Sequence, residues 1–572
     1  MKPFAVVHRS SRTFLAALTA LLALAATGTV APALAQEPLT NFKRPPVQTR
    51  QFGDLAEGPY NRLVIQNVNV LPGHGGPSVG LYDILIEGNE ITEMKRFDPY
   101  FPAEDREHIE GDRVIDGTGK WVMPGMINLH LHLRDEPLPL DYVYYLQLAT
   151  GITTVGPASD RGLDEAMTDA GRSARNEMLA PRMFPLWGWG EGISGYSRAQ
   201  LEDPAMAPEI AEKMVAAGAR QVYLNGLCWN RELFGAAARA VTAAGGITAV
   251  HIQPSSTSEV TAVDAAEEGV TMIVHHYGYA ESALNRQVQD YPRDYEFYNE
   301  NQRFREAAKV WLEAGQNPET RKRLLGEVVD RLVASGVVMQ PNRATYEANR
   351  DILRAMGMPW HEKYTHQALW NLHLPNPQNH AVFHYDWTSD DEYYWQYMYS
   401  LWGELIFEFN KRGGTVVFGT DDNYQWSTGG FGNIRELQLM RETGMHSLEV
   451  LRTATQNSAR LLKEDRLGLV RPGYLADLLI VDGNPAENLR YLYPFGAIRM
   501  DENQQMYRTK GIIYTIKDGV VVDNAKVMEE VARMVAESKV NAGPDVVNSP
   551  VLPVPEWMTR PLSETEGSGG QR

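Results

Sequence analysis

The 572-residue sequence predicts a mixed α/β fold: a (β/α)8 TIM-like barrel with a small composite β-sandwich formed from both ends of the chain. Two observations predict this fold. Eight short apolar runs alternate with helix-sized segments through the middle of the chain, as the strands of such a barrel do. Short strand patterns separated by turn residues flank this region on both sides, and they predict a β unit shared between the two flanks.

The N-terminal segment has the pattern of a leader sequence rather than of a folded element. Three basic residues precede an apolar run over 14–26, and Ala33-Leu34-Ala35 follows it. A charged start, a short apolar stretch and a small-residue cleavage motif are typical of a secretory signal peptide, here over 1–35. The run is shorter than the roughly 20 residues that cross a bilayer. We therefore expect a periplasmic or secreted protein without stable membrane insertion.

The segments around the barrel are assigned from composition and alternation. Residues 36–60 are polar and contain proline, which predicts a linker. Alternating apolar residues with Gly and Asn turns predict an antiparallel first part of the β-sandwich over 61–125. Strand patterns that include 467–470 predict its second part over 465–525. Residues 526–572 are expected to form a C-terminal helix and tail.

The predicted barrel covers residues 126–464. Its eight expected strands are the apolar runs at 126–132, 153–156, 183–186, 221–224, 247–252, 272–275, 337–340 and 416–419. Long intervals around the seventh run predict inserts near 277–330 and 343–410. Inserts at the carboxyl ends of the strands would cover the face on which such barrels carry their active sites.

Charge and cysteine content exclude several kinds of partner and site. The 54 basic and 72 acidic residues give a formal charge of −18, which argues against nucleic acid or an anionic membrane as the main partner. One cysteine, Cys228, excludes an internal disulfide framework and a thiolate-rich metal site. These features are compatible with a small-molecule partner and with a homo-oligomer.

Histidines and one aspartate stand at the ends of the predicted barrel strands. His130 and His132 close the first run, and because strand side chains alternate, both imidazoles face the same way. His251 and His275 end the fifth and sixth runs, and Asp421 ends the eighth. Four imidazoles and a carboxylate at one rim would need a cation to balance them. Nitrogen and oxygen donors without thiolates favour Zn²⁺, with Mn²⁺, Fe²⁺ and Co²⁺ as alternatives.

Several segments resemble the amidohydrolase superfamily of metal-dependent hydrolases, and more narrowly its prolidase and imidazolonepropionase-like branch. The resemblance spans about 60–525, apart from the two inserts. The segments that carry it are VIDGTGK at 114–120, VMPGMINLHLH at 122–132, GITTV at 151–155, ATQNSAR at 454–460, LG at 467–468 and PGYLADL at 472–478.

The resemblance implies a metal-dependent hydrolase that acts on carbon–nitrogen bonds. It implies that the four histidines and Asp421 bind one or two divalent ions, most simply Zn²⁺, which activate water and polarise the scissile carbonyl. It also implies that Asp421 takes a proton from the attacking water and returns it to the leaving nitrogen, so that Asp421 and His275 are the catalytic residues.

Three positions depart from the family pattern. Asn128 stands where an aspartate is usual before the histidine pair, and Val274 replaces a common glutamate before His275. Tyr223 takes the place of the strand-four lysine that the branch often carbamylates to bridge two metals. A tyrosine cannot be carbamylated, although a phenolate can bind metal, and Glu191 after the third strand is another carboxylate ligand candidate. The number of ions therefore stays open.

The favoured function is an exported amidohydrolase that acts on a small-molecule amide or peptide-like substrate. Dipeptides with proline, acylated amino acids and cyclic amides all suit this chemistry. One alternative is a single-metal, deaminase-like hydrolase of a cyclic amidine, which would release ammonia. Another is a non-catalytic binding protein on a decayed barrel, which would purify with little metal.

Overall fold

The computed structural model of this chain describes residues 52–98, 100–133, 137–159, 161–284, 299–374, 384 and 387–541. The predicted signal peptide, most of the predicted linker and the predicted tail after residue 541 lie outside these residues.

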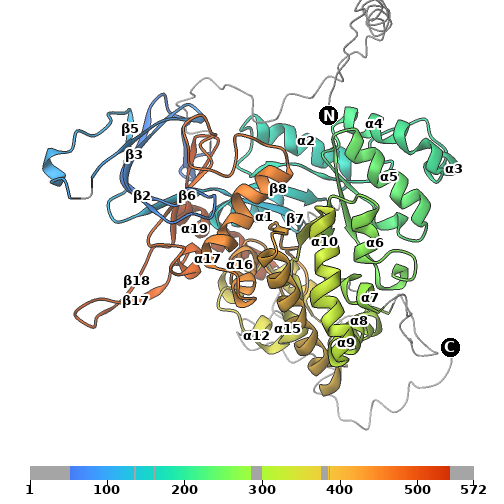
Figure 1. Cartoon of the computed structure of the whole chain (residues 1–572). Coiled ribbons are helices and arrows are strands. Elements are labelled where there is room, and N and C mark those ends of the chain that lie inside the picture. The colour runs from blue at the N-terminus through green and yellow to red at the C-terminus, as the bar shows by residue number, and fades with distance from the viewer. Residues whose placement is uncertain are drawn as a thin grey trace, which may run out of the picture. The chain divides into compact units, whose positions relative to one another are not determined.

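One sheet combines strands from both ends of the chain (Figure 1). Its strand order is β1-β20-β19-β16-β6-β2-β3-β4, and β5 pairs with β2. The strands are β1 (Ala56–Glu57), β2 (Leu63–Val70), β3 (Val79–Glu87), β4 (Glu90–Arg96), β5 (Arg113–Asp116), β6 (Trp121–Pro124), β16 (Leu478–Val481), β19 (Ile512–Lys517) and β20 (Val520–Asp523). The central pairing joins β6 to β16, with Pro124 opposite Leu478 and Trp121 opposite Val481.

Two details of this sheet differ from the sequence-based expectation. The N-terminal part is mixed rather than antiparallel, because β2 pairs in parallel with β5 and with β6. The chain between β4 and β5 is long enough to return to the start of the sheet, and such a crossover is what a parallel pair needs. The strand expected over 467–470 is wrong: these residues form bends and irregular backbone.

Two parallel sheets form the other β region. One has the order β7-β8-β9 and the other β10-β11-β12-β13-β14-β15. The strands are β7 (Met126–His132), β8 (Ile152–Ala158), β9 (Arg182–Met183), β10 (Leu186–Gly188), β11 (Gln221–Tyr223), β12 (Ile247–His251), β13 (Met272–Val274), β14 (Val338–Gln340) and β15 (Thr415–Val416). Pro185 separates β9 from β10, and without an N–H it cannot continue the ladder. This α/β arrangement is consistent with a TIM-barrel type of fold.

Alternation along these strands divides their side chains between two apolar clusters. Ile247 and Ala249 of β12 belong to a cluster with Met272 and Val274 of β13, while Val250 and its neighbours pack in the main core. His251 follows Ala249 at the same period of two, so it continues the face of Ile247 and Ala249. The apolar pattern of the strand thus directs an imidazole to its carboxyl end.

Helices follow and connect the strands. Those of the first half are α1 (Leu140–Ala149), α2 (Leu163–Ala174), α3 (Arg198–Leu201), α4 (Ala207–Ala217), α5 (Arg231–Ala243), α6 (Ala262–Glu267) and α7 (Tyr279–Ala283). The insert regions hold α8 (Glu300–Gln316), α9 (Pro318–Arg323), α10 (Val329–Ser335), α11 (Glu347–Arg350), α12 (Ile352–Met356), α13 (His361–Tyr364), α14 (Gln367–Leu372) and α15 (Ser389–Lys411). The last are α16 (Phe431–Glu442), α17 (Ser447–Arg452), α18 (Ser458–Leu461) and α19 (Asn524–Asn541).

The long helix α15 packs an aromatic side against the rest of the insert. Its Trp395 and Trp402 are fully buried, and the Trp395 indole N–H donates to the carbonyl of Phe304 on α8 at 3.0 Å. A short hairpin, β17 (Ile498–Met500) with β18 (Met506–Arg508), extends separately. Among the described residues, none of the helices combines the length and apolar character that crossing a membrane requires.

Candidate metal centre

The candidate ligands stand where parallel strands end, and two of them have unusual backbone conformations. His275 follows β13 with a φ of 69°, and Asp421 follows the eighth predicted strand with a φ of 55°. Left-handed backbone is uncommon for residues other than glycine and needs support from its surroundings. The N–H of His275 donates to the carbonyl of Gln340 at 2.9 Å, and the N–H of Asp421 donates to the carbonyl of His130 at 2.9 Å. These bonds turn both side chains toward the same space.

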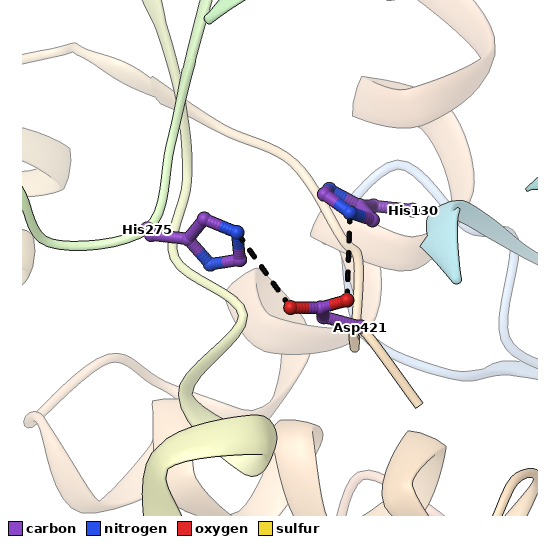
Figure 2. Close-up of side chains that lie close together, drawn as sticks. All are labelled: His130, His275 and Asp421. Carbon is purple, nitrogen blue, oxygen red and sulfur yellow. Dashed lines mark ion pairs between the residues drawn. The ribbon is translucent and has the colours of Figure 1, made fainter. Parts of the chain in front are cut away.

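His130, His275 and Asp421 converge into a buried group (Figure 2). One ligand atom from each lies within 4.8 Å of the others. The His130 Nε2 atom is 3.5 Å from one oxygen of Asp421, and the His275 Nε2 atom is 3.6 Å from the other. Two imidazoles thus approach one carboxylate from different strands, and the carboxylate lies between them.

The other two predicted histidine ligands border this group. The His132 Nε2 atom is 3.2 Å from Asp421 Oδ1, and its side chain is one-third exposed. The ring of His251 lies 4.4 Å from the ring of His275, centroid to centroid, and stacks on Tyr277 at 5.1 Å. All five residues predicted as the main ligand set are therefore neighbours in space.

Burial and charge together set the protonation states of the group. Burial lowers the pKa of His130 to about 4, although the nearby Asp421 works in the opposite direction. Burial also holds the pKa of His275 well below its usual value. For Asp421, burial would raise the pKa, but the surrounding histidines outweigh it and keep the pKa well below its usual value. At neutral pH the group therefore consists of neutral imidazoles and a carboxylate, which are the forms that bind metal.

The residues present fit a divalent cation. The Nδ1 atom of buried His275 has no hydrogen-bond partner among the described residues. The donors are nitrogen and oxygen atoms, a set that suits Zn²⁺ and its neighbours in the first transition row. The carboxylate supplies negative charge that a cation would balance in a buried site.

Tyr223 and Glu191 occupy different surroundings from one another. The Tyr223 hydroxyl lies 3.0 Å from the Nδ1 atom of His130, the ring nitrogen that does not contact Asp421. Burial, with a contribution from Asp421, raises the pKa of Tyr223, so the phenol stays protonated. The carboxylate of Glu191 is exposed and accepts the backbone N–H of Gly188 at 2.5 Å in its own loop.

A cavity of about 440 Å³ opens beside the group. Its wall is mostly aromatic and polar, with Asp421 as the one carboxylate and Arg303 as the one guanidinium among the described residues that line it. The remaining lining residues, apart from the four histidines and Tyr223, are Ala158, Leu186, Trp187, Gly188, Asn225, Gln253, Pro254, Tyr277, Phe304, Tyr346 and Tyr424.

The structure adds residues that the sequence did not single out. The Asn342 side-chain nitrogen lies 3.3 Å from His130 Nδ1, next to the Tyr223 hydroxyl. Asn342 follows β14 as the ligands follow their strands, so its position at a strand end was an available signal. Arg303 and Phe304 lie on α8 in the insert, and no strand pattern in the sequence predicted that they reach the site.

Comparisons with known proteins agree with this geometry. The model of the amidohydrolase family matches residues 407–522, which include Asp421. A 5-methylthioadenosine/S-adenosylhomocysteine deaminase of Symbiobacterium thermophilum is 26% identical over 223 residues, which are 37% of this chain and 49% of that protein. The chain thus spans about half the length of this curated relative.

Solved structures share the fold at low identity. A Xaa-Pro dipeptidase with bound methionine in its active site has a TM-score of 0.51 and 18% identity, over 81% of this chain and all of that one. A bottromycin amidohydrolase has a TM-score of 0.56 and 14% identity, over 86% of this chain and 94% of that one. Residues 407–522 are thus identified as an amidohydrolase-family segment, and the chain as a whole is similar in fold to solved amidohydrolases.

Proposed function

We propose that this protein is a metal-dependent hydrolase that cleaves an amide-type carbon–nitrogen bond in a small substrate. The observation that carries the proposal is the convergence of His130, His275 and Asp421 beside a cavity of about 440 Å³. That volume suits a small molecule such as a dipeptide or an acylated amino acid. The hydrolase relatives and the family match support the same reaction class.

The chain's own residues divide the work around the ion. A divalent ion held by this group supplies Lewis acidity, which activates water and polarises the carbonyl. The carboxylate of Asp421 is ionised, so it accepts a proton from the attacking water. The same carboxylate returns that proton to the leaving nitrogen, which makes the cleaved amine a good leaving group. The neutral imidazoles of His130 and His275 orient the group without adding charge.

We favour one ion over two. A bridging ligand such as the branch's lysine would have to come from Tyr223 or Glu191. The phenol of Tyr223 is held protonated and meets the outer nitrogen of His130. The Glu191 carboxylate is engaged with Gly188. His132 and His251 are the proposed additional ligands of the single ion.

The cavity favours a substrate that carries a negative charge. Arg303 contributes a permanent positive charge to a wall whose other members are aromatic or neutral, apart from the ligand group. A carboxylate on the substrate would pair with this guanidinium in a two-pronged contact. Trp187 and Phe304 would cover an apolar side chain or ring. We therefore propose N-acyl amino acids and X-Pro dipeptides as the substrate class.

The test combines metal analysis with a hydrolysis screen. Purified protein should contain about one equivalent of a divalent metal, and it should hydrolyse N-acyl amino acids or X-Pro dipeptides with a KM about tenfold lower than that of their carboxyl-amidated forms. Arg303→Gln should raise KM about tenfold for charged substrates, since a charged hydrogen bond is worth about 1.5 kcal/mol or more. Metal-free protein that stays inactive after Zn²⁺ is added would refute the proposed reaction. An R303Q variant with an unchanged KM would refute only the carboxylate contact.

Deamination of a cyclic amidine remains the second candidate. It is favoured by a group that suits one ion and by the likeness to a deaminase. Ammonia release from an adenosine-type substrate, without hydrolysis of any acyl amino acid, would select this reaction instead.

Two further properties belong to the proposal. We infer that the two parallel sheets form one closed (β/α)8 barrel. The N–H of Leu129 on β7 donates to the carbonyl of Phe418 beyond β15 at 3.0 Å, and at the other gap only Phe184 and Pro185 separate β9 from β10. We infer a composite β-sandwich and export to the periplasm or medium on the terminal sequence patterns. Mass determination of the N-terminus of secreted protein would test the predicted cleavage after residue 35.

A further inference from the structure

A chain of buried side-chain amides runs behind the metal group. The His130 backbone N–H donates to Asn128 Oδ1 at 3.1 Å, and Asn128 Nδ2 donates to Asn433 Oδ1 at 2.9 Å. Asn433 Nδ2 donates to Gln147 Oε1 at 2.9 Å, and Gln147 Nε2 donates to Asp422 Oδ2 at 3.2 Å. The four side chains of this network are fully buried: those of Asn128, Asn433, Gln147 and Asp422. They link β7, α16, α1 and the residue after Asp421.

The two ends of this chain fix the direction of every bond in it. A backbone N–H can only donate, so Asn128 must present its oxygen to His130. An ionised carboxylate can only accept, so Gln147 must present its nitrogen to Asp422. Asn433, in the middle, must then accept from Asn128 and donate to Gln147. No amide in the chain can flip without two oxygens or two N–H groups facing each other.

The surroundings of Asp422 fit its role as the accepting end. The Gly430 backbone N–H donates to its Oδ2 atom at 3.1 Å, and the Ser427 hydroxyl donates to its Oδ1 atom at 3.2 Å. A Cβ atom at position 432 would lie 1.9 Å from Asp422 Oδ1, so Gly432 leaves the space that the carboxylate occupies. The carboxylate is thus held at one place and in one orientation.

We propose that Asn128, Asn433 and Gln147 are positioning residues, and that together with Asp422 they form a directional amide chain which sets the metal ligands His130 and Asp421 in place. The chain reaches His130 through its backbone N–H, and it reaches Asp421 through the neighbouring Asp422. Its direction explains why an amide, rather than a carboxylate, suits position 128 in this protein. A carboxylate there could not donate to the oxygen of Asn433, and the two oxygens would repel.

The proposal predicts a specific rescue. In Asn128→Asp, each amide along the chain has to flip, and the last flip turns the Gln147 oxygen toward Asp422. A second change, Asp422→Asn, supplies the missing donor, so the double variant has an unbroken chain that runs in the reverse direction. The two changed residues exchange their chemistry at opposite ends of the chain, with Asn433 and Gln147 in between. The Thr420 hydroxyl, which accepts from Asn128 Nδ2 at 2.8 Å, forms a second and shorter link to Asp422 and can reverse with the chain.

The experiment measures zinc affinity of the full-length protein by competition with a chromophoric chelator. N128D should bind Zn²⁺ about 10–100-fold more weakly, as other changes behind a ligand do. D422N should lose less, because an asparagine there can keep its oxygen toward Gln147 and Gly430 and donate its amide to the Ser427 hydroxyl. The double variant should recover to within about tenfold of the unchanged protein, with the Gly430 N–H contact as the part not restored. Melting temperatures of the metal-free proteins should follow the same order. These two readouts are independent of turnover, although the ligand set rests on the proposed function.

A matched control keeps the same charges without repairing the chain. Asn457 donates its Nδ2 to the carbonyl of Val416 at 2.9 Å, outside the chain. The double variant D422N/N457D should bind Zn²⁺ no better than D422N alone. If N128D does not fold, N433D with D422N asks the same question, because a flip of Gln147 alone then reconnects the chain.

Two outcomes distinguish a failure of the amide-chain proposal from a failure of the proposed function. If the losses in N128D and D422N simply add in the double variant, in zinc affinity and in melting temperature, the directional chain is refuted. If the unchanged protein binds no Zn²⁺ at all, the proposed function fails, and the melting temperatures of the metal-free variants still decide whether the chain exists.

Discussion

Two buried groups of charged residues in this protein show how structural and functional polar clusters differ. One joins Arg182 to Asp477 and Asp518, where the terminal sheet meets the parallel strands. Arg182 Nη1 lies 2.5 Å from Asp477 Oδ2, and Arg182 Nη2 lies 3.5 Å from Asp518 Oδ1. The remaining oxygen of Asp477 accepts the backbone N–H of Asp518 at 2.8 Å. Each charged group of this cluster therefore has partners within the cluster or beside it.

In the group around Asp421, by contrast, not every buried polar atom has a hydrogen-bond partner. Its carboxylate faces imidazole nitrogens at 3.2–3.6 Å, and the Nδ1 atom of His275 has no partner among the described residues. A cavity lies beside it, whereas Arg182 is not among the described residues that line this cavity. Buried charge that is saturated by its neighbours stabilises the fold, and buried charge that is left incomplete beside a cavity is arranged for a ligand.

The largest expected effect breaks the functional group and leaves the structural one intact. Asp421→Asn removes the proton acceptor but keeps the shape of the side chain, so turnover should fall by about 10²–10⁴-fold. The free energy of unfolding of the metal-free protein should change little, because no opposite charge is left buried alone. Steady-state hydrolysis and denaturant unfolding measure the two effects. Turnover that matches the unchanged protein would contradict the proton-transfer role.

The converse change breaks the structural cluster. Arg182→Met leaves two buried carboxylates without a cation, and this should lower the free energy of unfolding by about 3–5 kcal/mol. Zinc stoichiometry of the folded protein should stay as before. Adding D477N and D518N to R182M should restore much of the stability, as followed by denaturant unfolding. A loss of bound zinc in R182M without a loss of stability would reverse the comparison.

The smallest effect concerns the contact behind His130. Tyr223→Phe removes the hydroxyl at 3.0 Å from His130 Nδ1 but leaves Asn342 at 3.3 Å from the same atom. Asn342 can turn its side-chain oxygen, which has no partner among the described residues, toward this nitrogen. We therefore expect zinc affinity and kcat to fall by about tenfold, the lower limit for such changes. Tyr223→Phe combined with Asn342→Leu should cost more than the two single losses together. Complete loss of metal from the single variant would instead identify the phenol as a ligand.

Sequence reasoning was most successful where a strand pattern carries a residue to a defined place. His130, His251 and His275 each end an apolar run, and parallel strands that end at one edge bring such residues together. The family assignment is confirmed for the same reason, since it rests on motifs at strand ends and turns. The sequence-based prediction was wrong for the strand expected over 467–470 and for the antiparallel pairing of β2. Alternation reports a strand's exposed and buried faces, but not which neighbour it pairs with or in which direction.

By itself, the sequence determined the kinds of donor atom, their order along the chain and the strand ends on which they stand, because side-chain periodicity and apolar runs are local properties. Only the tertiary structure decided which ring nitrogen of His130 faces Asp421, that Tyr223 meets the other one, and that Arg303 of the insert reaches the cavity wall. The amide chain behind the ligands likewise could not be predicted from the amino-acid sequence. Hydrogen-bond direction depends on which groups meet across distant segments, and only the packed molecule brings those groups within 3 Å or so of each other.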